Sequence, residues 1–243
     1  MRSALESLLK AALFLGLGLF MGLYRLPPST DFDALIRKAE PTPVPAPLVP
    51  IRFYMQRLNL FKASSARADI VLLGDSLTEG GLWDEYLQRL PLLNRGISGD
   101  LSDGVLQRLL EVIDRKPNVV SLLIGANDLL AGFETSHTLG NIRQIVSNLH
   151  EAHIRTILHS VSFASPGYKP AINPGVDAIN PGIRALAQET ASDFLDLNAL
   201  TALDGALDPS MTYDGLHFNP KGYLVWSQAL RPKLEAARAQ PLR

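Results

Sequence analysis

A serine that follows an apolar run is the residue of this chain best suited to chemistry. Ser76 comes directly after the run Ile70–Leu73 and the pair Gly74-Asp75. A serine hydroxyl becomes a nucleophile when a neighbouring base removes its proton. A serine at a strand-to-helix turn can instead cap the helix by accepting a hydrogen bond from a free N–H group. This stretch alone supports both roles, so the remaining residues must decide.

A base for such a serine is offered by Asp214 and His217, which lie three positions apart just ahead of Pro220. At this spacing the two side chains can meet within one turn of chain. The carboxylate would bond one ring nitrogen, fixing the tautomer and leaving the other nitrogen to accept a proton from a serine hydroxyl. A lone surface histidine is the ordinary alternative.

Two further stretches could stabilise negative charge on a reacting oxygen. The segment Asn94–Asp100 contains glycines, which let the backbone turn sharply and point an N–H group at a ligand. In Gly125-Ala126-Asn127-Asp128, the side-chain amide of Asn127 could donate to a developing oxyanion. Taken singly, the first stretch is also an ordinary loop and the second is also ordinary turn chemistry.

The other candidate side chains indicate structure rather than chemistry. His150 and His153 lie three positions apart on a predicted helix, but no third metal ligand accompanies them, which favours a solvated face. His159 lies in a predicted strand and is expected to be structural. Residues 160–174 are predicted to form a long loop on the same sheet edge as Ser76, where the loop either lines a pocket or only connects two elements.

Apolar runs alternate with helical patterns from Ala68 onward, and this order predicts how the reactive residues are held together. Parallel strands need crossover connections, so the alternation indicates an α/β fold with both sheet faces covered. We expect a three-layer, flavodoxin-like, doubly wound parallel sheet of about five strands. The expected strands are Ile70–Leu73, Leu92–Asn94, Val119–Ile124, Thr156–Val161 and Phe194–Leu197. Helices are expected near residues 51–62, 82–90, 102–115, 135–152, 179–191 and 221–239.

The composition limits the possible functions. The chain has 243 residues, a net charge of −1 and no cysteine. The length allows one domain of ordinary size with extra segments. The balanced charge gives no electrostatic basis for binding nucleic acid. The absence of cysteine excludes disulfides and thiolate metal ligands and leaves the redox compartment open.

The N-terminus has the pattern of a membrane-targeting segment. Arg2 and Lys10 precede an apolar run from Ala11 to Tyr24, which Arg25 closes. The positive end favours a cytoplasmic N-terminus and export of the rest of the chain. No Ala-x-Ala-like site comes after the run, so an uncleaved anchor is favoured over a cleaved signal peptide. A buried helix is disfavoured because the run is apolar nearly all round. We expect a protein anchored in the inner membrane that faces the periplasm or the cell exterior.

These patterns divide the chain into three parts. Residues 1–25 are the signal anchor or signal peptide, residues 26–66 a Pro-rich linker with a lead-in helix, and residues 67–243 the α/β domain. In the linker, Pro41–Pro47 has proline at every second position, which favours a semi-rigid spacer between membrane and domain over a ligand for a partner.

The reactive stretches together resemble the four blocks of the SGNH, or GDSL, hydrolase family. In chain order they are Gly74-Asp75-Ser76-Leu77, the Gly99 loop, Gly125-x-Asn127-Asp128 and Asp214-x-x-His217. The resemblance covers about residues 68–232 and implies an SGNH hydrolase fold for residues 67–243. Residues 94–100 and 213–217 are most similar to those of platelet-activating-factor acetylhydrolase catalytic subunits and lysophospholipase L1-type esterases. Thr78 replaces the second glycine of Gly-x-Ser-x-Gly, which counts against an α/β-hydrolase fold.

The resemblance also implies a role for each site residue. Ser76 would be the nucleophile, His217 the general base and then acid, and Asp214 the residue that orients His217. The backbone N–H groups of Ser76 and Gly99, with the side-chain amide of Asn127, would form the oxyanion hole. No metal or organic cofactor is implied.

Hydrolysis of carboxylic esters is the expected function, with short acyl groups such as acetate on a carbohydrate or lipid as the favoured substrates. An O-acyltransferase acting on a surface polysaccharide is an alternative, and a membrane-tethered binding module without catalysis is another. The expected partners are such an ester and, through the N-terminal segment, the membrane. The oligomeric state is left open.

Overall fold

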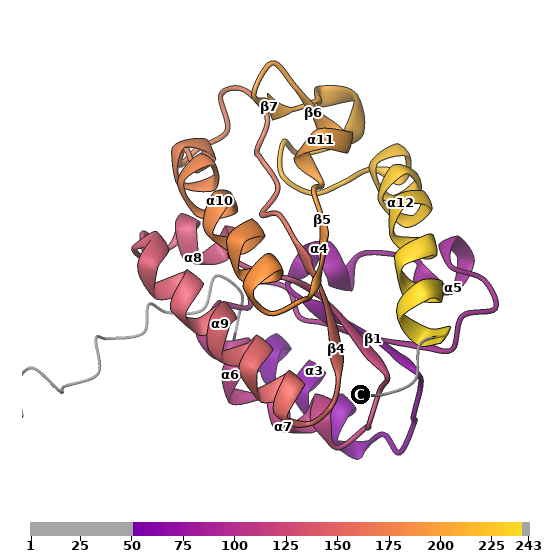
Figure 1. Ribbon diagram of the computed structural model, residues 1–243. Coiled ribbons are helices and arrows are strands. Elements are labelled where there is room, and N and C mark those ends of the chain that lie inside the picture. Colours follow the sequence, from indigo (N-terminus) through magenta and orange to yellow (C-terminus); the bar gives the residue numbers. More distant parts are fainter. Residues whose placement is uncertain (1–50, 240–243) are drawn as a thin grey trace, which may run out of the picture. The chain divides into compact units, whose positions relative to one another are not determined.

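A parallel sheet between two layers of helices forms the framework of residues 51–239, the part of the chain that the computed structural model describes (Figure 1). The five strands lie in the order β2-β1-β3-β4-β5, the flavodoxin-like order that the sequence predicts. Their bounds are Ile70–Gly74 (β1), Leu92–Gly96 (β2), Val119–Leu123 (β3), Arg155–His159 (β4) and Asp193–Leu195 (β5). The predicted α/β architecture is confirmed.

The central strands are mostly apolar because both faces of the sheet are buried. In β1, Ile70 and Leu72 pack into one hydrophobic core, whereas Val71 and Leu73 pack into the other. Strand β3 pairs with β1 and is likewise buried at every position. This arrangement explains why the sequence shows continuous apolar runs rather than alternating apolar and polar residues.

Two groups of helices cover these faces. Helices α6, α7, α9 and α10 pack on one face, and α5 and α12 pack on the other, as Figure 1 shows. The helices are α3 (Ile51–Ala63), α4 (Ser76–Glu79), α5 (Trp83–Tyr86), α6 (Ser102–Gln107), α7 (Leu109–Ile113), α8 (Ala126–Leu130), α9 (Thr135–Glu151), α10 (Asn173–Glu189), α11 (Asn198–Thr201) and α12 (Pro220–Ala239). A hairpin of β6 (Ala202–Leu203) and β7 (Ala206–Leu207) and the 3₁₀ turn η1 (Pro209–Met211) complete the fold.

Several boundaries differ from the predictions. Helix α10 begins at Asn173 rather than near residue 179, because Pro174 occupies its first turn, where no N–H donor is needed. The predicted helix 102–115 is interrupted at Arg108, whose backbone leaves the helical region while its side chain reaches a buried carboxylate. Only four residues of the predicted helix 82–90 are helical. The β6–β7 hairpin was not predicted.

The N-terminal predictions lie outside the described residues. These are the anchor or signal peptide at residues 1–25 and the Pro-rich part of the linker, whereas the lead-in helix is present as α3. Within residues 51–239, no helix combines the length and apolar character needed to cross a membrane.

Candidate active site

The turn after β1 presents Ser76 at the carboxyl end of the sheet. Gly74 is required there, because an added Cβ would lie 2.2 Å from the Leu123 carbonyl oxygen. The Asp75 carboxylate accepts a hydrogen bond from the Leu77 N–H at 3.0 Å and caps α4. Asp75 therefore performs the capping that the sequence left open for Ser76, and Ser76 is the first residue of α4.

A chain of short hydrogen bonds joins the predicted serine, histidine and aspartate. Ser76 Oγ lies 2.8 Å from His217 Nε2. On the other side of the ring, His217 Nδ1 lies 2.6 Å from Asp214 Oδ2. The structure thus brings together side chains that are 141 positions apart in sequence. In this geometry Nδ1 donates to the carboxylate and Nε2 can accept the serine proton.

The loop between η1 and α12 positions His217 and the Asp214 carboxylate. Asp214 Oδ1 also accepts from the backbone N–H groups of Leu216 and His217, at 2.9 and 2.7 Å. The Thr212 hydroxyl closes the loop by donating to the His217 carbonyl at 2.6 Å, and Gly215 allows its positive φ of 90°. Partial burial raises the pKa of Asp214, but the hydrogen bonds from His217 and Leu216 outweigh it, and the pKa is lowered overall. Asp214 is therefore ionised at neutral pH.

The predicted oxyanion donors form a second group beside the serine turn. Gly99 is buried in a turn closed by the bond from Asp100 N–H to the Ile97 carbonyl at 3.1 Å, and its φ of 73° suits glycine. Asn127, in the first turn of α8, donates through Nδ2 to the Asp100 carbonyl at 2.9 Å. An amide nitrogen has two hydrogens, so this bond leaves one for a ligand oxygen. The structure thus joins Asn127 to the Gly99 turn.

The predicted loop after β4 contacts this site. It runs from Ser160 to Ile172, and its Ser165 N–H donates to the Gly215 carbonyl at 2.7 Å. Burial, together with the negative charge of Asp214, raises the pKa of Tyr168 in the same loop. The loop therefore supports the Asp214 loop and is more than a connection.

The other predicted histidines lie away from this group. His159 is buried in β4, as expected of a structural histidine, and its Nε2 lies 2.7 Å from Ser121 Oγ. It is only half satisfied, because its Nδ1 has no hydrogen-bond partner among residues 51–239. The prediction of a solvated helix face is wrong for His150, which is half-buried and bonded to Thr156 Oγ1, and His153 lies beyond the end of α9. Residues 51–239 contain no cluster of three or more His, Asp or Glu side chains that could hold a metal ion.

Buried charges surround the serine turn, and the sequence patterns did not predict them. Burial raises the pKa of Asp75 to about 7; the Leu77 N–H opposes this shift, and the charges of Asp100 and Asp128 add to it. Asp100 forms an ion pair of 2.7 Å with Arg108, and both side chains are nearly inaccessible. The only signal for this pair in the sequence is an aspartate eight positions before an arginine, which is too common to be informative.

Comparison with known proteins shows the family to which this chain belongs. The sequence model of the GDSL-like lipase/acylhydrolase family matches residues 72–225. An isoamyl acetate-hydrolyzing esterase of Saccharomyces cerevisiae is 28% identical over 203 residues, covering 68% of this chain and 85% of the relative. The human platelet-activating factor acetylhydrolase IB subunit alpha1 is 30% identical over 183 residues, covering 71% of this chain and 78% of the relative.

Solved structures agree with the fold. The crystal structure of a putative acylhydrolase from Bacteroides fragilis superposes with a TM-score of 0.66 at 26% identity, covering 77% of this chain and 96% of that one. The chain therefore belongs to the GDSL-like lipase/acylhydrolase family and is a carboxylic ester hydrolase. The resemblance to platelet-activating-factor acetylhydrolase and lysophospholipase L1-type enzymes is confirmed, since relatives of both kinds match.

Proposed function

We propose that the chain hydrolyses esters of short acyl groups through an acyl-enzyme on Ser76. The observation that carries this proposal is the continuous contact from Ser76 Oγ to His217 Nε2 at 2.8 Å and from His217 Nδ1 to Asp214 Oδ2 at 2.6 Å. It supplies a nucleophile, a base and a carboxylate that holds the base in the required tautomer.

The reaction proceeds in two steps. Ser76 Oγ attacks the ester carbonyl carbon while His217 takes its proton, and the tetrahedral intermediate expels the alcohol, which receives that proton from His217. Water then attacks the acyl carbon with His217 again as base, which releases the acid and restores Ser76. The N–H groups of Ser76 and Gly99 and the amide of Asn127 stabilise the negative oxygen in both steps.

The acyl group and substrate class are argued from the relatives. Two of them are named for acetyl esters, a small alkyl acetate in yeast and platelet-activating factor in human. These names support acetyl or another short acyl group as the acyl part of the substrate, and the human relative supports a lipid as its alcohol part. A carbohydrate ester is kept as the alternative from the sequence alone.

A panel of p-nitrophenyl esters from acetate to octanoate tests both parts of the proposal, with Ser76→Ala as the blank. We expect the highest kcat/KM with acetate and no turnover above background with Ser76→Ala. A preference for octanoate would overturn the short-acyl assignment. Equal turnover by Ser76→Ala would overturn the mechanism. Adding an acceptor sugar distinguishes hydrolysis, which yields free acid, from transfer, which yields an acylated sugar.

We also propose that residues 1–25 anchor the enzyme in the inner membrane with the catalytic domain outside the cytoplasm. Support comes from the sequence alone: Arg2 and Lys10 lie before the apolar run 11–24. Fractionation of cells that express the full chain should place the enzyme in the membrane fraction. Release by detergent but not by salt would support an anchor, whereas recovery in the soluble cytoplasmic fraction would contradict it.

A further inference from the structure

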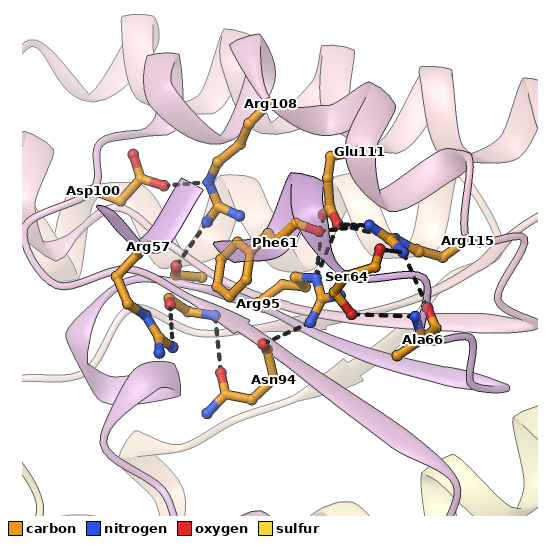
Figure 2. Close-up of polar contacts among 12 residues, drawn as sticks. Arg57, Phe61, Ser64, Ala66, Asn94, Arg95, Asp100, Arg108, Glu111 and Arg115 are labelled. Atoms are coloured by element: carbon orange, nitrogen blue, oxygen red, sulfur yellow. Dashed lines mark hydrogen bonds and ion pairs between the residues drawn. The ribbon is translucent and has the colours of Figure 1, made fainter. Parts of the chain in front are cut away.

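Helix α3 precedes the segment that matches the family, yet it is fastened to the end of β2. Arg57 donates through Nη2 to the Gly96 carbonyl at 3.4 Å (Figure 2). Its Nε lies 2.9 Å from Glu79 Oε1, in an ion pair rather than an aligned hydrogen bond. Phe61 packs under two guanidinium groups, with its ring centre 5.0 Å from Arg57 and 4.6 Å from Arg95. These contacts fix α3 beside the candidate site.

Glu79 links the nucleophile helix to the Gly99 turn. Its Oε2 accepts hydrogen bonds from the backbone N–H of Ser98 at 2.6 Å and from the Ser98 hydroxyl at 2.5 Å. Glu79 is the last residue of α4, which begins at Ser76, and Ser98 directly precedes Gly99. The backbones are also in close contact, because a Cβ on Gly96 would lie 2.2 Å from the Glu79 nitrogen. One carboxylate thus sets the turn relative to the serine.

The other end of the turn is held by a second buried charge. Asp100 accepts from Arg108 Nε at 2.7 Å, and Arg108 also donates to the Gly74 carbonyl at 3.1 Å (Figure 2). Burial, followed by the charge of Asp100, raises the pKa of Tyr54 to about 12. Tyr54 and Arg57 are three positions apart and so share one face of α3. Helix α3 therefore places Arg57 against Glu79 at one end of the turn and Tyr54 near the Asp100 carboxylate at the other.

We propose that Glu79 is a positioning residue for the Gly99 N–H and that Arg57 holds Glu79 in place. This inference rests on the proposed function, since it takes the Gly99 N–H as a donor to the reacting oxygen. Because Glu79 binds Ser98 at two atoms, the peptide that comes next has little freedom to rotate. Donors to an oxyanion act most strongly when they are oriented before the reaction. Loss of Glu79 should therefore reduce kcat more than it changes KM.

The test compares Glu79→Gln with Glu111→Gln in the full chain. Glu111 is a matched control: it lies in the same arginine cluster, 3.2 Å from Arg95 and 2.7 Å from Arg115, and is similarly inaccessible (Figure 2). With p-nitrophenyl acetate we expect kcat of Glu79→Gln to fall by about tenfold with KM within about twofold, by analogy with a displaced oxyanion donor. Glu111→Gln should keep both constants within about twofold.

Two variants of Arg57 extend the test to α3. Arg57→Ala should lower kcat by roughly threefold, and Arg57→Lys should recover at least half of the loss, because a cation beside Glu79 is restored. If thermal melting shows that Glu79→Gln does not fold, the two Arg57 variants test the inference instead. An unchanged kcat in Arg57→Ala would then overturn it. A folded Glu79→Gln enzyme with the kcat of Glu111→Gln would overturn the inference. Ser76→Ala is assayed alongside: if it is inactive, such a result leaves the proposed function standing, whereas an active Ser76→Ala refutes that function.

Discussion

Two serine–histidine pairs have almost the same oxygen-to-nitrogen distance but lie in different surroundings. Ser76 Oγ is 2.8 Å from His217 Nε2, and Ser121 Oγ is 2.7 Å from His159 Nε2. The His217 side chain is 30% exposed and its second nitrogen contacts Asp214. His159 is only 2% exposed, and its Nδ1 has no hydrogen-bond partner within residues 51–239.

This difference shows that a short contact does not make a catalytic pair. Burial, with a smaller effect of the Lys233 charge, lowers the pKa of His159 to about 3. A histidine with so low a pKa is a weak base, and a buried serine cannot reach an ester. His217 has the access and the carboxylate that His159 lacks. Substitutions around the two pairs should therefore differ in effect, from a near-total loss of activity to a change in stability alone.

The same substitution in both histidines should separate the pairs most widely. His217→Gln removes the base, so kcat/KM for p-nitrophenyl acetate should fall by about 10⁴-fold or more. His159→Gln should leave the kcat/KM of the folded enzyme within about threefold. Initial rates at pH 7, normalised to the folded fraction, measure both. Comparable losses in the two variants would mean that the buried pair contributes to the reaction.

The carboxylate behind the base gives the second contrast. Asp214→Asn should lower kcat by about 10³-fold, because the amide no longer favours the tautomer in which Nδ1 carries the proton. Asp103 is the control, since it lies 2.8 Å from a different histidine, His137, on the surface. Asp103→Asn should keep kcat within about twofold. A mild effect of Asp214→Asn, similar to that of Asp103→Asn, would remove Asp214 from the mechanism.

Asn127 tests the oxyanion group rather than the proton path. Asn127→Ala removes an amide donor, and kcat should fall by about a hundredfold with little change in KM. Steady-state kinetics with p-nitrophenyl acetate separate the two constants. A rise in KM at constant kcat would show instead that Asn127 only binds the substrate.

The buried Ser121–His159 pair should change how the free energy of unfolding depends on pH. His159 is neutral in the folded state, whereas its unfolded form takes up a proton below pH 6.5. Its contribution to stability is thus complete above pH 6.5 and is lost progressively as pH falls towards about 3. Between pH 7 and pH 5, urea unfolding should show that wild type loses about 2 kcal/mol more than His159→Gln. Parallel losses in the two proteins would contradict this assignment.

The sequence was most informative where chemistry and local pattern coincide. Continuous apolar runs predicted the five strands, and the expectation of a flavodoxin-like fold predicted their order. Asp214 and His217 follow no strand of this sheet directly, since they lie between η1 and α12, and the family resemblance predicted their approach to Ser76. The 2.8 Å contact between Ser76 and His217 depends on crossovers spanning most of the domain, yet family-like spacing was enough to anticipate it. The catalytic roles of these residues remain predictions.

Contacts that depend on the three-dimensional path of the chain could not be predicted in this way. Glu79 and Ser98 are 19 positions apart. Nothing in either segment indicates that the Glu79 carboxylate accepts from both the backbone N–H and the hydroxyl of Ser98. The buried pair of Asp100 and Arg108 likewise requires a helix interruption that has no periodic signature. The predicted start of α10 was wrong because Pro174 was assigned to the preceding loop, whereas it lies in the first turn of the helix.

Labelling of the full chain with a fluorophosphonate probe, followed by peptide mass spectrometry, tests the central claim most directly. The probe reacts with a serine only where a base and an oxyanion site activate it. The account predicts stoichiometric modification of Ser76, none of Ser121, and loss of labelling in His217→Gln. An unlabelled Ser76 in active enzyme, or a probe found on another serine, would contradict it.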